Sequence, residues 1–229
     1  MRLVHESLEN PIFTDDIRCS ILVLENPRQF YQIVRELAAQ LENDQGSFVL
    51  SHEMKPQKLS RYIHFITDFP FLDFNPRKVL TGLYKQLSEA VVENDRIDRI
   101  QSLLDELAVE MKKIAPESET ELDEIETPGW NEVFKFFNLQ FRTEHLTAEE
   151  ALSDYFRIMR KYCGYQIFVI LNSLGFLNIE SLRLLIRDAE YENIQLLFLE
   201  DHVQEEHQKV SHQTLIVDRE FCEILINHL

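Results

Sequence analysis

The sequence predicts an α/β protein with a mainly parallel sheet and an inserted helical segment. Three observations support this fold class. Short, almost wholly apolar runs recur along the chain, amphipathic helical patterns lie between them, and one long helical stretch interrupts the alternation. Apolar runs of this kind are typical of strands that are buried on both faces, as in parallel sheets. Strand, helix and strand in succession are typical of α/β layers.

Six segments are predicted to be strands. Most of them show no alternation of polar and apolar residues, which indicates burial on both faces. In chain order they are residues 20–25, 47–51, 62–67, 166–172, 194–199 and 213–218. With 229 residues, 45% of them apolar, the chain is long enough to bury a substantial core.

Three helices are indicated by their starting residues. The first begins at Asn26, a favourable N-cap, followed by Pro27 at the first helical position. Another starts at Thr147, and Glu150 three residues later completes a capping box. A third follows Asn178, with its apolar residues on one face.

The middle of the chain, from residue 75 to residue 114, is predicted to be helical, with an interruption at 93–96 that is compatible with a bend. From Ile97 its apolar residues step alternately by three and four, which forms a narrow seam suited to a neighbouring helix. We expect the helix that begins at Thr147 to pack there, antiparallel. The chain therefore divides into an α/β head (1–78 with 164–229) and an inserted helical leg (79–163).

Composition excludes several classes of protein. The chain has only five glycines and neither pattern of a phosphate-binding loop, which argues against an ordinary nucleotide-binding enzyme. Three scattered cysteines indicate reduced thiols in a cytoplasm. We see no secretory signal and no run that could span a membrane, so a cytoplasmic location is expected. The net charge of −17 disfavours nucleic acid unless basic residues are locally concentrated.

Carboxylates are concentrated in two kinds of place. Residues 117–126 are strongly acidic and form either a solvated loop or a site for Ca²⁺, which prefers carboxylate oxygens. Asp68 follows one predicted strand, and Glu200 and Asp201 follow another, where α/β proteins often bind ligands. These three residues leave open a metal-dependent phosphohydrolase, although strand-end capping or a subunit contact would also explain them.

Basic residues occur in three clusters. They are Lys55, Lys58 and Arg61 before a predicted strand, Arg77 and Lys78 at the start of the long helical stretch, and Arg157, Arg160 and Lys161 before another strand. Such clusters are either ordinary surface charge or parts of one groove for the backbone of a nucleic acid duplex.

The order of several segments resembles a known family. "SILVLEN", "MKPQKLSRYIHFITDFPFLDFN", "IFVILNSLGFLNIESL", "LLFLE" and "VDREFCEI" follow one another with the spacing of the small accessory proteins of type II-A CRISPR adaptation systems. The resemblance covers nearly the whole chain. It implies an α/β head related to P-loop ATPases but without a phosphate loop, and a helical leg inserted into the head.

The resemblance also implies a function and its residues. These proteins are non-catalytic homotetrameric rings that hold double-stranded DNA, preferably with a free end, during spacer acquisition. Adaptation proteins and the type II effector nuclease are the implied partners, and calcium bound by leg carboxylates is the implied cofactor, with no nucleotide. By position, the DNA contacts would be Lys55, Lys58, Arg160 and Lys161, with Arg61, Arg77 and Lys78 beside them, and the calcium ligands Glu117, Glu119, Glu121, Asp123 and Glu124.

The turn at Asn172 and Ser173 lies where a nucleotide would be handled in a P-loop relative. Because the glycine loop is missing, we expect this turn to brace subunits or backbone. An adaptor that contacts proteins only remains a further alternative to the DNA-binding ring.

Overall fold

The computed structural model describes residues 1–92, 97–114, 127–142, 144 and 147–227. The chain forms two compact units. The head unit comprises Met1–Phe74 and Thr143–Leu229, and the inserted unit comprises Asn75–Arg142. No helix in the described part of the chain is long and apolar enough to cross a membrane.

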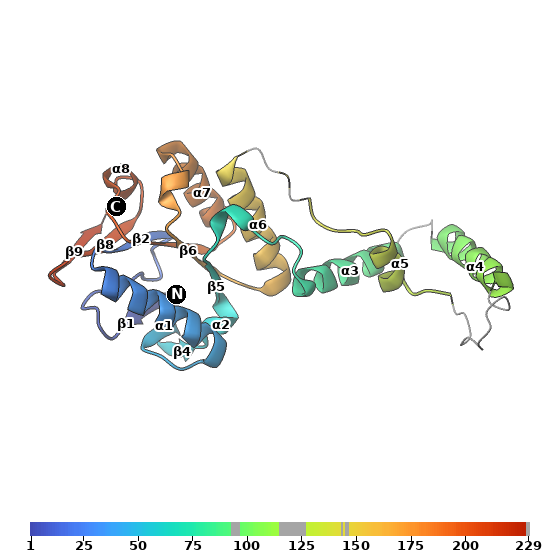
Figure 1. Ribbon diagram of the computed structural model, residues 1–229, viewed down its shortest axis with the longest axis horizontal. Helices are drawn as coiled ribbons and strands as arrows, with labels where there is room; N and C mark the ends of the chain where they lie inside the picture. The colour runs from blue at the N-terminus through green and yellow to red at the C-terminus, as the bar shows by residue number, and fades with distance from the viewer. Residues whose placement is uncertain (93–96, 115–126, 143, 145–146, 228–229) are drawn as a thin grey trace. The chain divides into compact units, whose positions relative to one another are not determined.

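The head unit is built on a six-stranded, mostly parallel sheet (Figure 1). Every neighbouring pair is parallel except the last, in which β9 runs antiparallel to β8. In spatial order the strands are β5 (Ile63–Ile66), β6 (Ile167–Leu171), β7 (Gln195–Glu200), β2 (Cys19–Leu24), β8 (Gln213–Val217) and β9 (Glu223–Asn227). The α/β class and the parallel sheet are confirmed.

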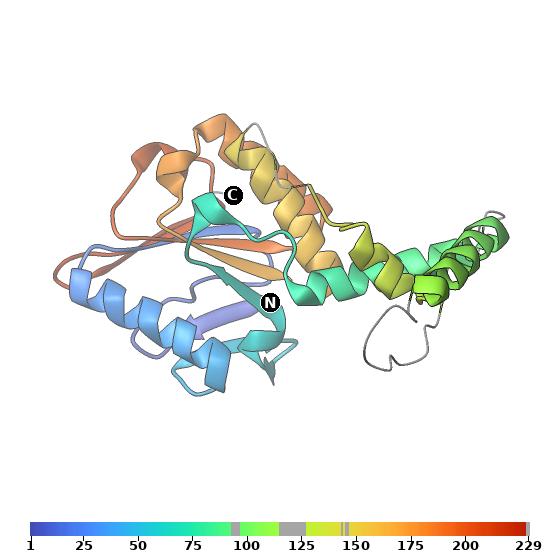
Figure 2. The same ribbon diagram turned by 45° about the vertical axis from the view of Figure 1, so that its right-hand side comes forward.

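Both faces of this sheet are covered, which explains its continuous apolar runs. One face, with Leu22, Val169 and Leu197, shares a core with helix α1 (Pro27–Asn43) and with a small second sheet. The opposite face is covered by helices α6 (Ala148–Cys163) and α7 (Ile179–Tyr191), as Figures 1 and 2 show. There the rings of Phe156 on α6 and Phe168 on β6 lie 4.6 Å apart.

The small sheet is antiparallel and consists of β1 (Arg2–His5), β3 (Phe48–His52) and β4 (Lys55–Gln57), in that order. The remaining elements of the head are short: helices α2 (Leu59–Tyr62) and α8 (Glu205–Gln208) and the single turns η1 (Phe69–Phe71) and η3 (Leu174–Phe176). The predicted strand 47–51 therefore exists as β3, but outside the parallel sheet.

The predicted helix starts are confirmed. Asn26 caps α1 with Pro27 behind it, Thr147 and Glu150 form the capping box of α6, and Asn178 caps α7. Helix α6 does not pair with the long helical stretch, however. Its apolar residues Tyr155, Phe156 and Met159 are buried in the head. The contacts thus group α6 with the sheet, although residues 147–163 were predicted to belong to the leg.

The inserted unit contains α3 (Arg77–Val92), α4 (Ile97–Ile114) and α5 (Trp130–Phe136). Helix α5 packs on α3 through the rings of Phe134 and Tyr84, which are 5.7 Å apart. The two ends of the unit are joined by Asn75: its amide donates to the carbonyl of Phe141 and accepts from the backbone N–H of Phe141. The expected interruption at 93–96 lies outside the described residues.

Candidate nucleic-acid interface

A tight hairpin between β3 and β4 presents Lys55. Its two-residue turn consists of Glu53 and Met54, both with positive φ angles (49° and 64°), as a type I′ turn requires. The turn pairs His52 with Lys55 and so places the lysine beside the hairpin tip. Lys55 is exposed, and no residue in the described part of the chain pairs with its ammonium group.

Lys58 lies between β4 and α2 and has a partner. Its ammonium is 2.8 Å from Oδ2 of Asp44, the residue that ends helix α1, and Ser60 donates to the other carboxylate oxygen. This hydrogen bond raises the pKa of Lys58 and lowers the pKa of Asp44. The Lys58 side chain is still 74% exposed, and ion pairs so accessible to water are weak. Lys58 can therefore exchange Asp44 for a phosphate at little cost.

The segments that precede β5 and β6 meet at the amino ends of these two neighbouring strands. Arg61 lies just before β5, with its guanidinium carbon 5.4 Å from the centre of the Tyr62 ring. The carbonyl of Tyr62 accepts a hydrogen bond from the backbone N–H of Gln166, which directly precedes β6. Two connections about 100 residues apart in sequence are thereby joined at one edge of the sheet.

Arg160 and Lys161 come from the last turn of α6 and lie just before β6. Arg160 lies 3.9 Å from Glu192, and the Lys161 ammonium lies 5.1 Å from the centre of the Tyr162 ring. Cations in this position are also favoured by the helix dipole. Arg157, one turn earlier, is held by Asp154 and Glu192.

Five of the predicted DNA contacts thus lie in the chain segments that precede β5 and β6. We call this group the basic edge; it consists of Lys55, Lys58, Arg61, Arg160 and Lys161. Arg77 and Lys78 do not belong to it, because they begin helix α3 of the inserted unit, where both are exposed.

The opposite end of the sheet is acidic. Glu25, Asp68, Asp201 and Asp218 follow the carboxyl ends of four parallel strands, and Glu200 ends β7. Because parallel strands all point the same way, residues that precede them and residues that follow them lie at opposite edges. These carboxylates therefore lie at the edge of the sheet opposite to the one at which the segments before β5 and β6 meet.

Glu200 is buried and braces the turn after β6. Its Oε1 accepts from the backbone N–H groups of Ser173 (2.9 Å) and Leu174 (3.1 Å). Burial raises the pKa of Glu200, and these two hydrogen bonds partly oppose that rise. A second link runs the other way: the side-chain oxygen of Asn172, in the turn, accepts a hydrogen bond from the backbone N–H of Asp201, just after β7. The turn and the end of β7 are thus held together by hydrogen bonds to the backbone, one of the two expected roles, and a contact between subunits stays a prediction.

Replacing Glu200 separates its charge from its hydrogen bonds. We expect Glu200→Ala to lower the free energy of unfolding by about 2 kcal/mol, because two buried N–H groups lose their acceptor. Glu200→Gln keeps an acceptor oxygen and removes a buried charge, so it should stay within about 0.5 kcal/mol of the original chain. Urea unfolding at pH 7 measures both. Equal losses would show that the negative charge itself is needed.

The predicted phosphohydrolase residues do not form a cluster. The carboxylate of Glu200 accepts hydrogen bonds from the backbone of the turn after β6, and Asp68 is exposed at the start of η1. Among the described residues, no group of three or more His, Cys, Asp or Glu side chains could hold a metal ion. The predicted calcium ligands Glu117, Glu119, Glu121, Asp123 and Glu124 all lie outside the described residues.

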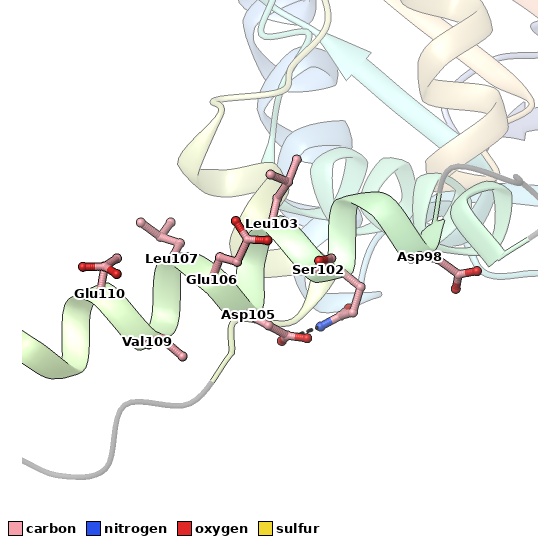
Figure 3. Close-up of a pocket in the computed structure, with 9 residues that line it drawn as sticks. Asp98, Ser102, Leu103, Asp105, Glu106, Leu107, Val109 and Glu110 are labelled. Atoms are coloured by element: carbon pink, nitrogen blue, oxygen red, sulfur yellow. Dashed lines mark hydrogen bonds between the residues drawn. The ribbon is translucent and has the colours of Figure 1, made fainter.

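Helix α4, which precedes that acidic segment, carries a groove of 790 Å³ along one side (Figure 3). Acidic side chains, among them Asp98, Glu106 and Glu110, line it together with Leu103 and Leu107. Asp105 accepts hydrogen bonds from Gln101 on the same helix and from Thr127, just after the acidic segment. The bond from Thr127 links the residue that follows the acidic segment to α4.

Sequence reasoning identified the basic residues but not their arrangement. The meeting of the segment before β5 with the segment before β6 had a usable signal, because residues that precede neighbouring parallel strands must share an edge. The pairing of Lys58 with Asp44 had none, since nothing in the pattern predicts which acid an exposed lysine will meet.

Comparison with known proteins places this geometry in context. Residues 40–221 match the model of a protein family described as CRISPR-associated protein (Cas_Csn2). The match includes the whole basic edge and the inserted unit. No curated protein matches the chain.

Proposed function

The chain belongs to the Cas_Csn2 family of CRISPR-associated proteins, and from this premise we propose that it is a non-catalytic, double-stranded-DNA-binding protein of CRISPR adaptation. Four copies form a ring that holds linear DNA in its channel while a new spacer is acquired. The head is a relative of P-loop ATPases without their phosphate loop. Other adaptation proteins and the type II effector nuclease are its partners.

The observation that supports this proposal is the set of five cations in the chain segments that precede β5 and β6. A chain with a net charge of −17 repels DNA overall, yet five of its cations lie in the segments that precede two neighbouring strands, β5 and β6. Phosphates bind through Lys and Arg with release of counterions, so a local basic edge suffices for binding. A closed ring also retains DNA by topology, which reduces the number of phosphate contacts that each copy must make.

The proposal includes calcium as a cofactor, bound by the acidic segment. Glu117, Glu119, Glu121, Asp123 and Glu124 supply only carboxylate oxygens, the ligands that Ca²⁺ prefers. A bound cation would relieve repulsion among these carboxylates. Calcium would act here on assembly and not on the DNA itself.

We expect linear duplex to bind in calcium buffer, and affinity to fall steeply as salt rises. A covalently closed circle of the same sequence should bind much more weakly, because it offers no end to enter a ring. Replacing calcium by a chelator should lower both the oligomer mass and the affinity. Equal binding of circle and linear duplex, or cleavage of the DNA when Mg²⁺ is added, would contradict the proposal. Binding to adaptation proteins without any DNA binding would favour the adaptor alternative.

A further inference from the structure

Strand β9 ends the six-stranded sheet with one side unpaired. It pairs with β8 over five residues in continuous register, from Glu223 opposite Val217 to Asn227 opposite Gln213. No other strand in the described part of the chain pairs with it. Its apolar residues Ile224 and Leu225 are 49% and 37% exposed.

The hairpin fixes which backbone groups face outward. The N–H of Asp218 donates to the carbonyl of Cys222, so these two residues form a hydrogen-bonded pair. Hydrogen-bonded and non-hydrogen-bonded pairs alternate along an antiparallel ladder. Ile224 and Ile226 therefore bond to β8, whereas the N–H and C=O groups of Glu223, Leu225 and Asn227 point away from the sheet.

Free edges of this kind are normally protected, and β9 lacks the usual protection. Proteins place lysine, proline or a bulge on an exposed edge strand to prevent pairing with another chain. The sequence of β9 is EILIN, and its register contains no bulge. Its single charge, on Glu223, is already engaged: the carboxylate accepts from the backbone N–H groups of Glu9 and Asn10 and from the side-chain amide of Asn10.

We propose that β9 pairs antiparallel with β9 of a second copy of this chain, centred on Leu225. In this register Leu225 lies opposite Leu225 of the second copy, and Glu223 lies opposite Asn227. All three outward-facing residues then find hydrogen-bonded partners on the second copy, and no like charges meet. Ile224 lies opposite Ile226, so the exposed apolar side chains cover one another.

This contact would join two heads through one continuous sheet. It rests on the proposed ring for its functional meaning, because it supplies one of the subunit contacts that a ring needs. Residues 223–227 lie outside the segment that matches the family model, so the contact is argued from this structure alone.

Proline at Leu225 gives a selective test. The N–H of Leu225 points outward, so Leu225→Pro removes a donor from the free edge and leaves the β8 ladder intact. We expect it to halve the mass measured by light scattering, while circular dichroism stays unchanged. Leu225→Lys, which places two like charges opposite each other, should have the same effect. An unchanged mass for both variants would overturn the inference.

Cross-linking tests the register itself. In a chain with Cys222→Ser, mild oxidation should link Leu225→Cys into a dimer, because hydrogen-bonded partners lie about 5.5 Å apart between Cα atoms, within reach of a disulfide. Ile224→Cys is the matched control: its counterpart would lie about 8 Å away, beyond that reach. Cross-linking of Ile224→Cys as fast as Leu225→Cys would overturn the register.

The outcomes also separate this inference from the proposed function. If Leu225→Pro keeps the original mass while the original chain binds linear duplex, the β9 contact is wrong and the DNA-binding role stands. If the β9 dimer forms and the original chain binds no duplex, the contact stands and the proposed function falls.

Discussion

Replacing Lys55 and Lys58 together by glutamate should lower the affinity for linear duplex at least about 100-fold in 0.15 M salt. Lys55 has no partner in the described part of the chain, and Lys58 is held only by an exposed ion pair with Asp44. Both are therefore free to meet phosphates, and each reversal turns an attraction into a repulsion. Fluorescence anisotropy with a labelled duplex measures the change, and the dependence of affinity on salt should become less steep as well.

A matched control separates a local contact from general repulsion. Arg183 and Arg187 are both exposed on α7, and changing both to glutamate alters the net charge by the same amount. This control should keep most of the affinity. Asp44→Asn provides the opposite test, because it releases Lys58 and should tighten binding. If the α7 variant loses as much affinity as the lysine variant, the basic edge has no special role.

The sequence predicts the buried part of the head well. Strands such as β6 and β7 must be almost wholly apolar because helices cover both faces of the sheet, so their runs are visible without any structure. Strands β1, β4 and β9 escape prediction because they are short or exposed. Strands β4 and β9 bury few side chains, and β1 buries Leu3 and His5 but has only 4 residues, so no clear periodicity marks any of the three.

The placement of α6 shows a different limit. Its apolar face was predicted, but an apolar face does not specify its partner: another helix and a sheet both accept Tyr155, Phe156 and Met159. The length of the connection to β6 determines which partner α6 packs on, because Gly164 ends the helix three residues before the strand begins. So short a link keeps the helix against the sheet.

The candidate interface shows the same division between composition and arrangement. Which residues are basic is evident from the sequence, but whether a cation is free depends on tertiary neighbours. Arg160 is partly occupied by Glu192 and Lys58 by Asp44, whereas Lys55 is not paired within the described residues. Ranking these residues as contacts therefore requires the structure.

His64 should make the stability of the head depend on pH. It lies on β5 with Nε2 2.8 Å from the Tyr155 hydroxyl, and its ring stacks on Tyr165 at 4.9 Å. Burial lowers the pKa of His64 to about 4. Between these two pKa values, the histidine of the unfolded chain, with an ordinary pKa of about 6.5, binds a proton, whereas His64 of the folded chain stays neutral. The free energy of unfolding is therefore complete above about pH 6.5 and is lost as the pH falls toward 4.

The expected loss is about 1 kcal/mol between pH 7 and pH 5.5, and about 3 kcal/mol once both states are protonated. Urea unfolding followed by circular dichroism measures it, and pH 5.5 keeps the chain above its isoelectric point of about 4.8. Other groups also titrate in this range, so the informative quantity is the difference from His64→Gln, which cannot titrate but can still bond Tyr155. That variant should lose about 1 kcal/mol less over the same interval. Equal pH dependence in the two chains would mean that His64 is protonated as readily in the folded head as in water.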